Sequence, residues 1–309
     1  MSEQIALELK ERYSVHPEQI DKLKKRVIVL ESEGLGIKPV NKPKLIMVGG
    51  QPGSGKSDLQ KYGELALDFN AVILSTDVLR SYHPFDQEIK KNYPEYYHNL
   101  TVDLARTLLI HLENFAVVNK LNVILETTLA NSAVILQKID KYRKQGYEIE
   151  LKVMAVNETV SFLGAENRYE SMILAEQSGR AVSKTNHDHN YAAIPATLQS
   201  LQDHKLLDAV MVYQRKMFEV DGNIDTQVIL SANDSSNFTK TYIEERNRPF
   251  SEIELKFLKQ TAENVKVMKQ NRGANLLERT RFDLNFKPFL EGKIGINHSK
   301  QLTKGFPSK

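Results

Sequence analysis

Short apolar runs alternate with longer amphipathic stretches along most of the chain. The apolar runs lie at residues 45–48, 71–75, 122–126, 148–156 and 209–213, and they have the length of strands buried on both faces. Between them, residues 57–67, 100–119, 131–146, 158–176 and 194–206 show the periodicity of amphipathic helices. Strands that alternate with helices predict an α/β fold in which helices flank a parallel sheet.

The two ends of the chain depart from this alternation. Residues 2–13 and 17–33 predict two helices, the second docked through an apolar stripe. Residues 224–234 resemble a marginal strand, and residues 251–270 predict a highly charged helix that packs through Ile253, Leu255 and Phe257. We therefore expect an N-terminal helical segment at 1–43, a core at 44–220, a helical extension at 221–284 and a loose tail at 285–309.

Composition restricts the class of protein only mildly. The 309 residues allow one large domain with appendages or two small ones, and a net charge of +3 is too small to indicate a nucleic-acid partner. The absence of cysteine excludes disulfides and cysteine-based metal sites. Without an apolar run of membrane-spanning length or a signal peptide, we expect no membrane partner and a cytoplasmic location.

The strongest chemical signal lies between the strand at 45–48 and the helix at 57–67. It is the P-loop pattern, formed here by Gly50, Gln51, Pro52, Gly53, Ser54, Gly55, Lys56 and Ser57. Its glycines let the backbone curl so that consecutive N–H groups point at phosphate oxygens. Lys56 is expected to reach the β- and γ-phosphates, and the Ser57 hydroxyl to bind Mg²⁺. The sequence therefore predicts binding of ATP or GTP with Mg²⁺.

A P-loop indicates a nucleotide but not a reaction. Neither residues 41–44 nor residues 119–122 fit the Asn-Lys-x-Asp segment with which GTPases read guanine, and the strand at 122–126 ends in one carboxylate rather than the adjacent pair of a motor ATPase. A kinase needs a carboxylate near the acceptor hydroxyl and arginines on a lid. Asp77 follows the strand at 71–75. Arg168 precedes a polar, lid-like segment at 178–190, and Arg180 lies in it. These residues favour a kinase.

These residues also resemble a known family. The resemblance is carried by residues 49–57, Asp77 with His83-Pro84, Glu126-x-Thr128, residues 154–156, Leu163-Gly164, Arg168-Tyr169-Glu170 and Arg180. Over residues 44–213 the chain resembles the zeta toxin family. This resemblance implies a P-loop kinase fold with a lid and transfer of the γ-phosphate of ATP or GTP to the 3′-hydroxyl of the N-acetylglucosamine in UDP-N-acetylglucosamine, which inhibits cell-wall synthesis. It also implies an antitoxin, expected to be a small helical protein, that blocks the nucleotide site.

The resemblance further implies roles for single residues. Asp77 matches the general base, Lys56 the phosphate-binding lysine, and Arg168 and Arg180 the arginines that hold the transferring phosphoryl group. We expect Glu126, Thr128 and Arg168 to contact the sugar nucleotide. Ala130 stands where relatives have an arginine, a place that Arg106 or Lys138 could fill. Another hydroxyl acceptor (a different nucleotide sugar, a dinucleotide or an antibiotic) is the alternative, as is a nucleotide-dependent ATPase or binding module.

Simpler structural interpretations stay open for three of these features. Asp77 could cap a helix that begins near Val78, a common use of aspartate. Arg168 could pair with Glu166 or Glu170 on the protein surface. For residues 187–189, His-Asp-His, we predict a solvated or substrate-facing loop rather than a metal site.

Overall fold

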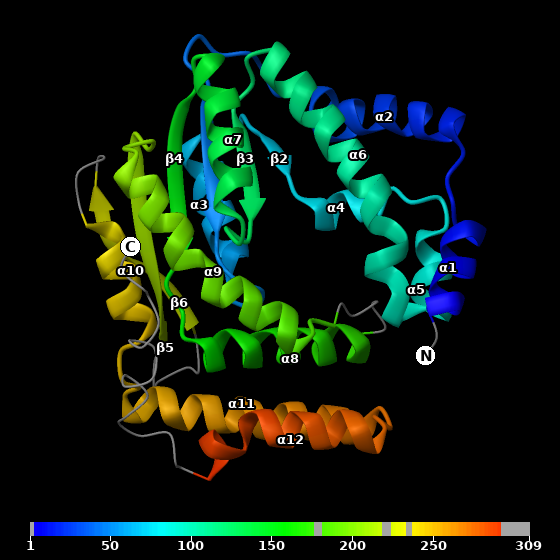
Figure 1. Cartoon of the computed structure of the whole chain (residues 1–309), viewed down its shortest axis with the longest axis vertical. Coiled ribbons are helices and arrows are strands. Elements are labelled where there is room, and N and C mark those ends of the chain that lie inside the picture. The colour runs from blue at the N-terminus through cyan, green and yellow to red at the C-terminus, as the bar shows by residue number, and fades with distance from the viewer. Residues whose placement is uncertain (1–2, 176–180, 218–223, 233–236, 292–309) are drawn as a thin grey trace, which may run out of the picture.

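A six-stranded sheet with helices on both faces forms the centre of the protein (Figure 1). The computed structural model describes residues 3–175, 181–217, 224–232 and 237–291. The strand order is β2-β3-β1-β4-β5-β6. The strands are β1 (Lys44–Gly49), β2 (Val72–Leu74), β3 (Val123–Thr127), β4 (Glu148–Met154), β5 (Ala209–Met217) and β6 (Ile224–Ala232). Pairing is parallel from β2 through β5, which confirms the predicted α/β fold, and β6 lies antiparallel to β5.

Most predicted amphipathic stretches are helical, with bounds that agree within a few residues, but α9 begins at Lys184, ten residues before the predicted start at 194. They are α1 (Glu3–Arg12), α2 (Pro17–Glu31), α3 (Lys56–Ala66), α4 (Thr76–Arg80), α5 (Asp86–Asn92), α6 (Tyr97–Val118), α7 (Ser132–Lys144), α8 (Glu158–Leu174), α9 (Lys184–Asp203), α10 (Phe238–Arg246), α11 (Glu252–Asn271) and α12 (Leu276–Leu290). None of the helices in the described ranges is long and apolar enough to cross a membrane.

The alternating side chains of β1 divide the core into two layers. Leu45 and Met47 join the cluster formed with α6, α7 and α9, whereas Ile46 and Val48 join the cluster formed with α3, α8, α11 and α12. All four side chains are fully buried, as expected for a central strand of a parallel sheet. Helix α2 belongs to the first layer through Val27, so the N-terminal apolar stripe is a packing surface.

The C-terminal part of the chain adds to both the sheet and the second layer. The sheet continues past residue 220, where we expected the core to end, because β6 pairs with β5 along its whole length. Helix α11 begins with the predicted capping box of Ser251 and Glu254. Its fully buried apolar positions are Leu258, Ala262 and Val265. Of the predicted trio, Leu255 and Phe257 are half-buried and pack against the second layer. Helix α12 extends to Leu290, so the first residues of the predicted loose tail are helical, and residues 292–309 lie outside the described part.

A buried ion cluster joins α11 to α8. The Glu170 carboxylate, fully shielded from solvent, accepts hydrogen bonds from Lys269 Nζ at 2.7 Å and from Arg272 Nε at 2.6 Å. Lys269 also lies 2.8 Å from the Glu166 carboxylate. Burial by itself would raise the pKa of Glu170, but the hydrogen bonds from Arg272 and Lys269 outweigh it and hold the pKa below its usual value. The cluster therefore fixes α11 against α8, and Arg272 also binds Glu278 of α12. Figure 1 shows α11 alongside α8 and α12 next to α11.

We predict that Glu170→Gln lowers the free energy of unfolding by about 3 kcal/mol, because it leaves buried cations without their counter-charge. Urea denaturation would measure this loss, with Asp140→Asn as the control. Asp140 forms an exposed pair with Lys144, so its loss should stay within about 0.5 kcal/mol. Because the pKa of Glu170 is lowered in the folded state, the difference from the native chain should shrink as the pH falls below 4.5, the usual pKa of glutamate. Equal effects of the two substitutions would contradict a structural role for the cluster.

Candidate active site

The P-loop lies directly against α8. Gly53 has a φ of +76°, and a Cβ atom on it would lie 1.9 Å from the Ser161 carbonyl oxygen. From the other side, a Cβ atom on Gly164 would lie 2.8 Å from the Gly53 carbonyl oxygen. Contacts this short exclude any side chain at either position. Two glycines, one in the predicted motif and one on the helix, therefore allow the backbone of the loop to touch the backbone of α8.

A hydrogen-bonded chain beneath the loop ties it to α8 and α9. Gln51 is fully buried, and its Nε2 donates to the Val156 carbonyl at 2.9 Å and to Ser161 Oγ at 3.0 Å. Ser161 Oγ lies 2.9 Å from His187 Nε2, and His187 Nδ1 lies 3.2 Å from an Asp188 carboxylate oxygen. Burial lowers the pKa of His187, and Asp188 opposes that effect. The histidine thus acts as a buried link between the loop and α9.

The prediction of a loop at residues 187–189 is therefore wrong. Ser183 caps α9 by accepting a hydrogen bond from the Asn186 N–H at 3.2 Å, so the helix already includes His187. The first turns of α9 bury this side chain against Phe162, with ring centroids 5.1 Å apart. Within the described residues, no group of three or more metal-ligating side chains is present.

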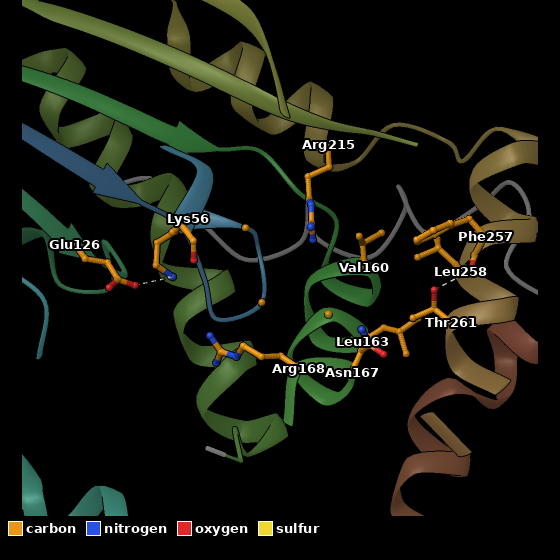
Figure 2. A pocket seen from close by; sticks show the side chains of 14 residues that line it. Lys56, Glu126, Val160, Leu163, Asn167, Arg168, Arg215, Phe257, Leu258 and Thr261 are labelled. Atoms are coloured by element: carbon orange, nitrogen blue, oxygen red, sulfur yellow. Dashed lines mark hydrogen bonds and ion pairs between the residues drawn. The ribbon is translucent and has the colours of Figure 1, made fainter. Parts of the chain in front are cut away.

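A cavity of about 250 Å³ opens beside the P-loop. Its two ends differ in chemistry (Figure 2). Lys56, Ser57, Glu126 and Arg168 line the polar end, and Val160, Leu163, Phe257 and Leu258 line the apolar end. Arg168 extends from α8 toward the P-loop and away from α11. Such a cavity can hold a molecule that carries an anionic group on one side and an apolar group on the other.

Polar contacts at the ends of three adjacent strands join the P-loop to the segment that carries Asp77. Lys56 Nζ donates to the Gln51 carbonyl at 3.2 Å and lies 3.8 Å from a Glu126 carboxylate oxygen. Ser75 Oγ donates to the other Glu126 oxygen at 2.8 Å. Because β2, β3 and β1 are parallel neighbours, their carboxyl ends meet at one edge of the sheet. Asp77 follows Ser75 by two residues and therefore belongs to this edge.

Asp77 lies inside a short helix rather than at its cap. The N-cap of α4 is Ser75, so Asp77 falls in the first turn, and its side chain is 42% exposed. Its carboxylate lies 3.6 Å from Nε of Arg80. Arg80 is buried and donates to the His98 carbonyl at 2.8 Å and to Thr101 Oγ1 at 2.9 Å. An accessible carboxylate oriented by a fixed arginine is suited to accept a proton from a bound hydroxyl.

The remaining predicted site residues fall into different surroundings. Glu166 and Glu170, considered as surface partners of Arg168, are instead engaged by Lys269 and Arg272. Thr128 is half-buried in the turn after β3, ahead of the fully buried Leu129.

Three further cations that we considered for the site are Lys138, Arg106 and Arg180. Lys138, considered as a substitute for an arginine at position 130, forms an ion pair with the buried Glu113 at 2.7 Å. Arg106 is exposed on α6. Arg180 lies outside the described residues.

Sequence reasoning missed Arg215, which lines the same cavity. It lies on β5, two residues past the strand predicted at 209–213, so its place after a core strand was an available signal. A Cβ atom on Gly55 would lie 3.3 Å from Nε of Arg215. This Nε has no hydrogen-bond partner among the described residues. Burial lowers the pKa of Arg215, although a guanidinium stays charged under all ordinary conditions. The protein thus has a third cation, besides Lys56 and Arg168, beside the P-loop.

Comparison with known proteins agrees with the predicted resemblance. The chain belongs to the zeta toxin family, whose model matches residues 31–226. It is 27% identical over 208 residues to toxin zeta of Enterococcus hirae, a match that covers 65% of this chain and 70% of the relative. It is also 27% identical over 187 residues to toxin PezT of Streptococcus pneumoniae, with 60% and 74% covered.

Two solved structures share the fold. A chain of the PezAT chromosomal toxin–antitoxin system of Streptococcus pneumoniae has a TM-score of 0.70 at 21% identity, and the match covers 83% of this chain and 98% of that one. A chain of the AvrRxo1-ORF1:-ORF2 complex with ATP has a TM-score of 0.51 at 11% identity, with 91% and 84% covered. At these identities the likeness concerns the fold alone.

We predict that Lys56→Ala weakens ATP binding about 10- to 150-fold, the equivalent of one charge-assisted hydrogen bond. Lys56 is largely buried at the polar end of the cavity, and among the described residues no other lysine lines it. Lys61→Ala is the matched control, because Lys61 lies on the same helix with its side chain 70% exposed. Calorimetric titration with ATP and Mg²⁺ would measure both affinities, and thermal unfolding would verify that both variants fold. Native affinity in Lys56→Ala would disprove the phosphate-binding role.

Proposed function

We propose that the protein is a kinase that transfers the γ-phosphate of ATP or GTP to the 3′-hydroxyl of UDP-N-acetylglucosamine. The observation that carries this proposal is the contact chain from Lys56 through Glu126 to Ser75. It joins a phosphate-binding loop to an accessible carboxylate, Asp77, at the carboxyl edge of a parallel sheet. Membership of the zeta toxin family supports the same class of reaction.

The polar end of the cavity has the groups that phosphoryl transfer requires. Lys56 and Arg168, together with Arg180, would stabilise the negative charge on the transferring phosphoryl group. The Ser57 hydroxyl and the Glu126 carboxylate are oxygen donors, the type that Mg²⁺ prefers, so the residues present fit this ion. When bound, Mg²⁺ would neutralise charge on the phosphates.

Asp77 would act as the general base. It would take the proton of the acceptor hydroxyl while the acceptor oxygen forms its bond to the γ-phosphorus and the bond from that phosphorus to the β-phosphate oxygen breaks. The products are a phosphorylated acceptor and the nucleoside diphosphate. Arg80 would keep the carboxylate oriented, because its own position is fixed by Thr101 and the His98 carbonyl.

An antitoxin is the partner that this function would require. The PezAT structure is named as a toxin–antitoxin system, which supports such a partner for this chain. We propose that a small helical protein blocks the nucleotide site and so prevents phosphorylation in the producing cell.

Ala130 favours a second candidate function, a kinase of another hydroxyl acceptor. The family resemblance implies an arginine at this place, and an arginine is suited to hold a diphosphate through paired hydrogen bonds. The ion pair between Lys138 and Glu113 makes Lys138 a poor substitute. Incubation with γ-labelled ATP and a panel of UDP-sugars, dinucleotides and aminoglycosides would distinguish the two candidates, since the label marks the acceptor.

We predict that Asp77→Asn lowers kcat by about 10²–10⁴, the range for loss of a general base, and changes nucleotide affinity much less. The fold should persist, because Arg80 retains its partners on α6. Asp103→Asn is the control, since Asp103 is exposed on α6 and pairs with Lys10. Collapse of nucleotide binding in Asp77→Asn would mean that Asp77 serves the metal ion rather than the proton.

We predict that Ala130→Arg lowers the KM for UDP-N-acetylglucosamine by about tenfold or more at unchanged kcat, because it adds uniform binding energy. Gln137→Arg, an exposed position on α7, controls for the added charge alone. Steady-state kinetics with UDP-N-acetylglucosamine would measure both constants. If no UDP-sugar takes the label while another hydroxyl compound does, the acceptor is wrong but the kinase activity stands.

A further inference from the structure

We propose that helix α11 supplies the wall of the nucleobase site, so that the base of ATP or GTP lies at the apolar end of the cavity between α8 and α11. This inference rests on the proposed nucleotide-binding function and adds a part of the site that the family match does not include. That match ends at residue 226, whereas α11 spans Glu252–Asn271. The C-terminal helices would then be a working part of the nucleotide site.

The chemistry of the apolar end suits a flat heterocycle. Leu163 from α8 and Phe257 and Leu258 from α11 provide apolar surface, as Figure 2 shows on the side away from Glu126. Asn167 adds an amide to the same lining, and Thr261 adds a hydroxyl. Thr261 Oγ1 donates its hydrogen to the Phe257 carbonyl at 2.9 Å, so it offers a base an acceptor oxygen. A base has apolar faces and polar edges, so it needs both kinds of group. The triphosphate would occupy the opposite end, beside Lys56 and Ser57.

Arg215 lies between the two ends. Its Nε is shielded from solvent and has no hydrogen-bond partner among the described residues, although it lies beside Gly55 at the turn of the P-loop. A buried donor of this kind has a strong tendency to bind an acceptor or the face of a ring. A nucleotide that spans the cavity brings its α-phosphate and its base past this point, so one ligand would engage both ends and the guanidinium.

The wall is held in place at both of its ends. Near its start, the Glu254 carboxylate accepts hydrogen bonds from two Arg248 nitrogens, at 2.8 and 2.5 Å. Near its end, Lys269 and Arg272 bind Glu170 of α8. Between these anchors, Leu258, Ala262 and Val265 are buried in the second core layer. Phe257 therefore has a fixed position before any ligand arrives, which reduces the entropic cost of binding.

A plug is the alternative function for α11. The cavity volume of about 250 Å³ is somewhat below the roughly 300 Å³ at which ligand pockets begin, so α11 could reduce the space for a nucleotide. Phe257 and the P-loop residues line one and the same cavity, which favours a wall. The two functions predict opposite changes in affinity when Phe257 is shortened, because removal of a wall weakens binding and removal of a plug strengthens it.

Calorimetric titration of the full chain with ATP and with tripolyphosphate, each with Mg²⁺, tests the wall. Tripolyphosphate has the phosphates of ATP but no base. We expect Phe257→Ala to weaken ATP binding about tenfold and to leave tripolyphosphate binding unchanged, since the lost contact is with the base. Val267→Ala is the matched control, because Val267 is half exposed on the same helix and does not line the cavity. It should change neither affinity.

Thr261→Val provides a second variant that keeps the shape of the side chain. It should weaken ATP binding about threefold and leave tripolyphosphate binding unchanged. The proposal that α11 forms the wall of the nucleobase site would be overturned by unchanged or tighter ATP binding in Phe257→Ala. An equal loss of affinity for both ligands would also overturn it. If Phe257→Ala does not fold, the same outcomes in Thr261→Val decide. Failure of the native chain to bind either ligand would instead overturn the proposed function.

Discussion

The close contact between the P-loop and α8 is the constraint on which the rest of the site depends. Two glycines, Gly53 and Gly164, bring the two backbones so near that a side chain on either would collide with a carbonyl oxygen. Because protein interiors are packed to nearly crystalline density, a displacement of one element also moves the elements that touch it. Any change at this contact would therefore move the phosphate loop relative to Arg168, four residues after Gly164.

Helix α8 distributes this constraint to three neighbours. Ser161 Oγ accepts a hydrogen bond from the side-chain amide of Gln51 in the P-loop and lies within hydrogen-bond distance of His187 of α9. Glu170, more than two turns later, binds the cations of α11. One helix thus connects the P-loop, α9 and the C-terminal helices. Desolvation offsets much of the attraction among these buried charges, so the loss of one partner costs more than the pair contributes to net stability.

The position of Asp77 relative to the P-loop depends on strand order instead. Strand β3 lies between β2 and β1, so Glu126 at its end can contact both Ser75 and Lys56. Parallel pairing brings Ser75 and Lys56, which are 51 and 70 residues from Glu126 in the sequence, to one edge of the sheet. The position of Asp77 thus follows from β-sheet topology, and its orientation from the buried Arg80.

Local periodicity in the amino-acid sequence was enough to predict the strands and most helices. Short motifs were enough to predict the capping box at Ser251, the P-loop and the family. Most of the candidate site was therefore visible in advance, and Arg215 carried a usable signal. The tertiary structure alone decided that His187 is buried, that Glu166 and Glu170 bind α11, and that Phe257 faces the cavity. Each of these depends on which distant elements pack together. An amphipathic pattern states that a helix has a buried face, but not which partner buries it.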